Sequence, residues 1–166
     1  MNSRELVDHV RSGPAYLVLL KPLSFPPCSN SLCDFNDFLQ ALQSSETIRD
    51  VSCFSHQALG ITEDKWVLLV QTLGSIRDIR CLKFCCERGS RDFHPFQAVA
   101  EAVNSARSLH KLAFFLICPS FPRDQSGLIA LAGALQQHTT LQIFSLIDLI
   151  DQPEAAPVDL SFDLVL

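Results

Sequence analysis

One spacing of apolar residues recurs four times along the chain, and it limits the available folds more than any other feature. It is clearest in residues 69–84, where Leu73 is followed by Ile79, Leu82 and Phe84 at offsets of six, nine and eleven. The same offsets recur from Leu42 (Ile48, Val51, Cys53), from Val103 (Leu109, Leu112, Phe114) and from Leu135 (Leu141, Phe144, Leu146). Four matching blocks predict a repeat architecture.

Each block has the pattern of a helix that turns into a short strand. An apolar residue lies four positions before each anchor, where it stacks on the same helical face: Phe38, Leu69, Val99 and Leu131. The position just before each anchor is small, which lets neighbouring helices approach: Ala41, Thr72, Ala102 and Ala134. The residues at offsets nine and eleven alternate with period two, so they point to one side of a strand. One unit is therefore a helix, a turn, a strand and a loop.

Capping and proline signals set the expected boundaries of these elements. Asp34 and Thr62 are expected N-caps, and Pro95 suits a first helical turn, where its missing N–H costs nothing. We expect strands at residues 16–20, 50–54, 80–86, 111–118 and 142–149. We expect three regions: an N-terminal cap or degenerate first repeat at 1–33, the repeat array at 34–150, and a C-terminal linker at 151–166. Residues 158–166 alternate only in part and can form a last strand.

Helix–strand units in series require parallel strands joined by crossovers, which are nearly always right-handed. Stacking then buries each helix and strand against the next unit. The predicted fold is α/β: a right-handed solenoid, or horseshoe, of about four to five helix–strand repeats with a parallel sheet on its concave face. The alternative is a non-repetitive α/β domain in which the spacing is coincidental.

The spacing resembles that of leucine-rich repeats of the ribonuclease-inhibitor type, L-x-x-A-L-x-x-x-x-x-L-x-x-L-x-L, in a degenerate form. The closest match is LIALAGALQQHTTLQIFSL at residues 128–146, and the resemblance covers residues 35–149. The family usually places an asparagine three residues after the last leucine, where its side chain bonds loop backbone. These positions hold His56, Glu87, Ile117 and Leu149. The asparagine ladder is therefore absent, and the loops must satisfy their backbone groups in another way.

The resemblance implies a function, because the family binds proteins through the concave strand face. The strand side chains that would line this face are Asp50, Ser52 and Phe54; Cys81, Lys83 and Cys85; Lys111, Ala113 and Phe115; Ile143, Ser145 and Ile147. An apolar row within this set, rimmed by Lys83 and Lys111, would mark an interaction site: Phe54, Cys85, Phe115 and Ile147. The alternative is that the row is buried under a terminal segment or further repeats.

The composition of the chain limits the kind of partner that it can bind and the cellular compartment in which we expect it. The chain of 166 residues carries a formal net charge of −5, which argues against a nucleic-acid partner. Residues 1–10 are charged and the apolar run at 16–20 is short, so we expect neither a signal peptide nor a membrane span. The seven cysteines are odd in number. We expect them to be reduced packing residues of a cytoplasmic or nuclear protein.

Recognisable catalytic and cofactor motifs are missing from the sequence. It holds no P-loop, no G-x-G-x-x-G and no G-x-S-x-G. Cys28 and Cys33 lack a second ligand pair at zinc spacing. We therefore expect no catalytic, cofactor-binding or metal-ligating residues, and a protein as the partner. Two alternatives stay open: a small α/β enzyme in which His110 activates the Cys81 thiol, or a fragment of a larger repeat protein without independent function.

Overall fold

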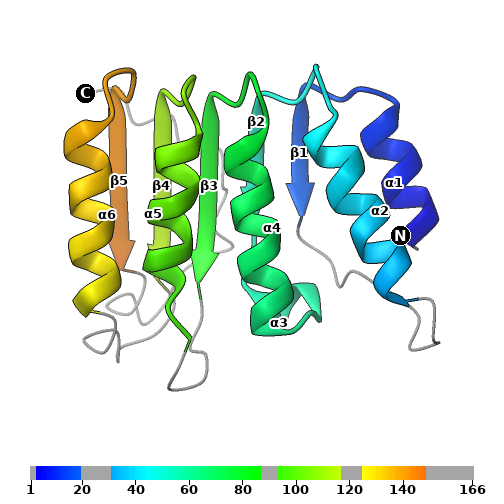
Figure 1. The fold of residues 1–166 in the computed structure, drawn as a ribbon, viewed down its shortest axis with the longest axis horizontal. Helices are drawn as coiled ribbons and strands as arrows, with labels where there is room; N and C mark the ends of the chain where they lie inside the picture. Colours follow the sequence, from blue (N-terminus) through cyan, green and yellow to red (C-terminus); the bar gives the residue numbers. More distant parts are fainter. Residues whose placement is uncertain (1–2, 20–30, 87–92, 117–124, 149–166) are drawn as a thin grey trace, which may run out of the picture.

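The computed structural model of the chain describes residues 3–19, 31–86, 93–116 and 125–148 (Figure 1). Within them lie five strands and six helices. In chain order these are α1 (Ser3–Arg11), β1 (Tyr16–Leu19), α2 (Ser31–Gln43), β2 (Asp50–Cys53), α3 (His56–Leu59), α4 (Glu63–Ser75), β3 (Cys81–Cys86), α5 (Pro95–Ser105), β4 (Lys111–Leu116), α6 (Gln125–Gln137) and β5 (Ile143–Asp148). The expected alternation of helices and strands is confirmed.

The strands form one parallel sheet in chain order, β1-β2-β3-β4-β5. Figure 1 shows the helices as a layer on one side of this sheet. The predicted α/β class with a parallel sheet is therefore confirmed. β1 pairs with β2 and α1 packs on α2, so the first helix and strand continue the same two layers.

The repeated apolar positions form the core between the helices and the sheet. Leu42, Leu73 and Val103 are fully buried, as are the residues that follow them at offsets six, nine and eleven. Burying one such side chain stabilises the fold by about 1.5–3 kcal/mol. The fourth unit differs: Leu135 and Leu141 are only partly buried, and Phe144 and Leu146 are exposed. The predicted core is thus confirmed for three of the four units.

The helix ends follow the expected capping chemistry in two cases and depart from it in a third. The Thr62 hydroxyl accepts a hydrogen bond from the backbone N–H of Lys65 at 3.4 Å, and Pro95 opens α5. The N-cap prediction for Asp34 is wrong, because α2 begins at Ser31. Leu32 precedes Phe35 by three residues, so the apolar period extends one turn upstream of the predicted cap.

Two features of the second unit were not predicted. A short helix, α3, begins after Ser55, which caps it, and ends at Gly60, whose φ of 65° lies in the left-handed region.

The close approach between α4 and α5 also involves an unexpected residue. Ala102 meets Gly74, whose missing Cβ would lie 2.5 Å from the Ala102 Cα atom. Thr72, the predicted small residue, is half-buried and donates to the Leu68 carbonyl instead.

Several sequence predictions lie outside the described residues. These are the expected last strand at 158–166, the loop positions Glu87, Ile117 and Leu149, and Cys28. Among the described helices, none is long and apolar enough to cross a membrane.

Candidate protein-interaction surface

The far face, which we define as the side of the sheet pointing away from the described helices, carries the side chains singled out from the sequence. Since side chains alternate along a strand, the residues between the buried core positions point to this face. The strand register aligns them in two rows: Tyr16, Asp50, Cys81, Lys111 and Ile143 in one, and Val18, Ser52, Lys83, Ala113 and Ser145 in the other. Neighbours in a row lie about 5 Å apart between strands.

The accessible part of the far face is aromatic and charged. Tyr16 is 51% exposed and Val18 is 38% exposed, while Asp50, Lys83 and Lys111 are half-buried. The Tyr16 hydroxyl lies 3.3 Å from the Ser52 hydroxyl on the next strand. Tyr16 and Val18 were absent from the predicted set. The sequence signal was the alternation of side chains along a strand. If β1 is placed in the same sheet as β2, this alternation assigns Tyr16 and Val18 to the far face.

Two members of the apolar row at the ends of the strands, Cys85 and Phe115, are buried. Cys85, Ala113 and Phe115 are buried, and the partly buried Phe54 packs against them. These side chains form one cluster across adjacent strands, so Cys85 and Phe115 are not part of an exposed stripe. The side chain of Ile147 lies outside the described set.

Charged groups surround Cys81 at the centre of the first row. Burial raises the pKa of its thiol and Asp50 raises it further, while Lys83 and Lys111 lower it, so the net direction is upward. Reactive thiols need the opposite shift, because the thiolate is the nucleophile. His110, the base in the alternative enzyme hypothesis, places its Nδ1 atom 2.6 Å from the Ser108 carbonyl oxygen. This environment suits a packing thiol.

The other described thiols are buried. Cys53, Cys85 and Cys86 lie inside the fold. Burial raises the pKa of Cys53, with a smaller contribution from nearby Cys85. Within the described residues, no group of three or more His, Cys, Asp or Glu side chains is arranged to hold a metal ion.

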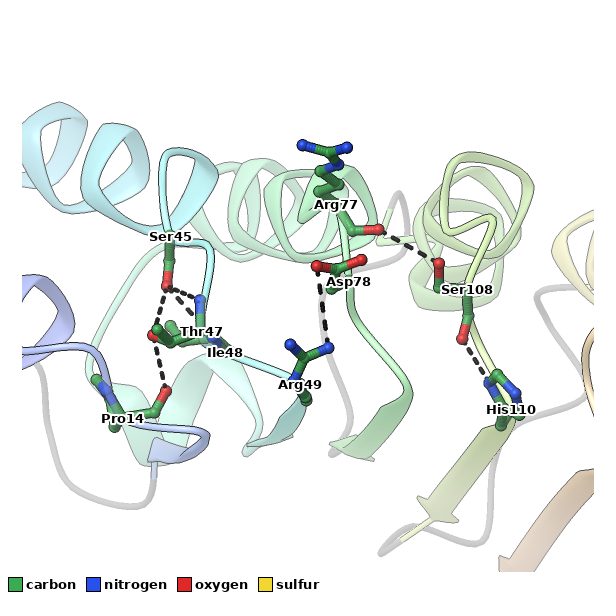
Figure 2. Close-up of polar contacts among 9 residues, drawn as sticks. All are labelled: Pro14, Ser45, Thr47, Ile48, Arg49, Arg77, Asp78, Ser108 and His110. Atoms are coloured by element: carbon green, nitrogen blue, oxygen red, sulfur yellow. Dashed lines mark hydrogen bonds and ion pairs between the residues drawn. The ribbon is translucent and has the colours of Figure 1, made fainter.

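A ladder of oxygen-bearing side chains joins successive units at the turns between helix and strand, and Figure 2 shows its contacts at Thr47, Asp78 and Ser108. The ladder residue lies five positions after each anchor, and in each unit it reaches back to the unit before it. The contacts are Thr47 to the Pro14 carbonyl (3.5 Å), Asp78 to the Arg49 guanidinium (3.9 Å), Ser108 to the Arg77 carbonyl (3.4 Å) and Thr140 to the Arg107 carbonyl (3.1 Å). The sequence signal was present, because an oxygen-bearing side chain recurs at offset five in all four units.

The backbone continues this ladder at the start of each strand. One carbonyl in each unit accepts N–H groups from two consecutive residues of the next unit. Arg49 and Asp50 both donate to Ala15, Arg80 and Cys81 to Arg49, His110 and Lys111 to Arg80, and Gln142 and Ile143 to His110. These bonds satisfy the turn backbone at this end of the sheet.

At the opposite end of the sheet, the family's asparagine position is described in one unit. His56 occupies it and opens α3. Its Nε2 atom lies 3.9 Å from a Glu63 carboxylate oxygen, and its ring centroid lies 4.9 Å from that of Phe93. A short helix therefore stands at this position in place of an asparagine.

Comparisons with known proteins find no sequence relative. No protein-family model matches the chain, and no curated protein matches it. A solved Caenorhabditis elegans structure described as the tropomodulin C-terminal domain is similar, with a TM-score of 0.47 and 11% sequence identity. The match covers 87% of this chain and 82% of that one. A likeness of this degree implies neither shared function nor shared partners.

Proposed function

We propose that this chain is a non-catalytic scaffold that binds a protein partner through the far face of its sheet. Its helix–strand units would form a right-handed solenoid of the leucine-rich-repeat type. One observation carries the proposal: the five strands follow chain order and the described helices form a layer on one side. Parallel sheets are normally covered on both faces. Among the described residues, the second face keeps the side chains of Tyr16, Lys83 and Lys111 accessible, and these are the groups that a partner would contact.

The chemistry of the far face favours a protein partner with acidic and apolar groups. Tyr16 offers a rigid aromatic anchor, a residue type that is enriched at binding hot spots. Lys83 and Lys111 outnumber Asp50 among the charges of the two rows. The inner strands are hydrogen-bonded on both sides, so recognition would use side chains rather than strand addition. We place the protein in the cytoplasm, where its thiols stay reduced.

The double substitution Lys83→Glu and Lys111→Glu tests this surface. It reverses the charge of the far face, and Arg4→Glu with Arg107→Glu is the matched control, because both arginines are exposed elsewhere and the net charge changes equally. Proteins captured from cytoplasmic extract would be quantified by mass spectrometry. Proteins that bind the far face should be depleted about tenfold by the lysine substitutions and retained by the control.

Circular dichroism and urea unfolding would establish that both variants keep the fold. An identical set of captured proteins, in identical amounts, for the lysine variant and the wild type would refute binding through the far face.

A further inference from the structure

The C-terminal edge of the sheet exposes side chains that are buried everywhere else in the array. Phe144 shares its register row with Leu17, Val51, Leu82 and Leu112, which are at most 1% exposed, yet Phe144 is 44% exposed. Leu146 is 48% exposed in a row whose other four members are at most 2% exposed. The side chains of a row point to the same side of the sheet. The exposure therefore comes from the edge position of β5 and not from its orientation.

The helix beside this edge, α6, is also uncharged and partly apolar on its exposed surface. α6 holds no Asp, Glu, Lys or Arg, although it is the outermost described helix at this end. Ile129 is 68% exposed on it. In Figure 1, α6 lies further out than β5, so a strand added to β5 would lie on the sheet side of α6. Terminal units of repeat arrays need a polar outer face for solubility. This end of the described array has an apolar one.

A segment of the same chain has the pattern that this edge requires. Residues 158, 160, 162, 164 and 166 are Val, Leu, Phe, Leu and Leu. Asp159, Ser161 and Asp163 lie between them, and Val165 is the one departure from alternation. A strand with this sequence has one apolar and one polar side. Its apolar side, like the side chains of Phe144 and Leu146, is stabilised by burial against another apolar surface.

We propose that residues 158–166 pair with the edge of β5 that no described strand occupies, as a sixth, antiparallel strand, with their apolar side chains beside Phe144 and Leu146 and beneath α6. The direction follows from the connection. Only nine residues, 149–157, join the two strands, whereas a parallel connection usually needs a dozen or more. Tethering so close gives the segment a millimolar effective concentration at the edge, so it outcompetes a second copy of the chain. The pairing also removes an unpaired strand edge that would otherwise promote aggregation.

Hydrogen exchange of the full chain tests this pairing with two matched substitutions. Phe162→Lys places a charge on the apolar side of the segment, and Ser161→Lys places the same charge one residue away on the polar side. In the wild type, amides in 143–148 and 158–166 should both be protected. Phe162→Lys should speed exchange in both segments at least about tenfold, and Ser161→Lys should leave them unchanged. Phe144→Lys should release 158–166 in the same way.

Three outcomes would overturn the proposal. In the first, residues 158–166 of the wild type exchange at the rate of an unstructured peptide. In the second, Phe162→Lys leaves the protection of both segments intact. In the third, protection of 143–148 rises with protein concentration while light scattering reports a dimer, and the edge then pairs with a second copy. Loss of binding at the far face would not affect any of these readouts, so the two proposals fail independently.

Discussion

Two helical glycines should respond in opposite directions to the same substitution. An added Cβ at Gly74 would lie 2.5 Å from both the Cα and O atoms of Ala102, well inside van der Waals contact. Either α4 and α5 must move apart, or the contact stays strained. Overpacking of this kind costs about 1–3 kcal/mol, and the gain in helix propensity offsets about 0.5–1 kcal/mol of that. Gly74→Ala should therefore lower the free energy of unfolding by about 1–2 kcal/mol.

Gly133→Ala in α6 is the control, because an added Cβ there meets nothing within 4 Å. Only the propensity gain remains, so this variant should be more stable by about 0.5–1 kcal/mol. Urea unfolding followed by circular dichroism measures both. With a slope of about 2 kcal/mol per molar urea, the midpoint should fall by about 0.5–1 M for Gly74→Ala and rise by about 0.3–0.5 M for Gly133→Ala.

The atoms that Gly74 meets belong to the backbone of Ala102, and this allows a further check. Trimming that side chain cannot relieve the contact, so Gly74→Ala combined with Ala102→Gly should be no more stable than Gly74→Ala alone. A rise in midpoint for Gly74→Ala equal to that of Gly133→Ala would refute the close approach of the two helices.

Three further predictions concern the core, the ladder and the thiols. Trp66→Phe should cost about 2–3 kcal/mol in urea unfolding, because the buried indole N–H donates to the Phe54 carbonyl at 3.0 Å; a cost below about 0.5 kcal/mol would contradict that bond. Thr140→Val should cost about 1 kcal/mol by removing a ladder hydroxyl, whereas Thr139→Val, at an exposed neighbour, should cost little in the same assay. Burial raises the pKa of Cys53, so above the ordinary thiol value of about 8.5 the thiolate forms only in the unfolded chain. The free energy of unfolding should be constant below that pH and fall between pH 8.5 and 10. Cys53→Ala should make this fall less steep, and an equal fall in the variant and the wild type would contradict the raised pKa.

The apolar spacing predicted the elements and the core side of each strand, because both depend on local periods. Helix and strand periods of 3.6 and 2 residues place Leu73, Leu82 and Phe84 on the buried side whatever surrounds them. The ladder at offset five was equally present in the sequence. It went unrecognised because Thr, Asp and Ser look like ordinary turn residues until the units are stacked.

Other features depend on which residues become neighbours. The small residue that admits α5 is Gly74 rather than Thr72, because the helix contact lies two residues beyond the expected position. The far face likewise contains Tyr16 and Val18 only because β1 joins the sheet. Neither relation is contained in the spacing within one unit.

The sequence alone determined that the chain repeats a helix–strand unit and which residues of each unit face inward. The tertiary structure decided which of those residues are exposed. Phe84 and Leu146 occupy the same position in their units, yet Phe84 is fully buried and Leu146 is half exposed. Phe115, for which the sequence left both an open and a covered row possible, is buried with Cys85 and Ala113. The physical reason is that periodicity sets the direction of a side chain, whereas burial depends on the neighbouring units that stack against it.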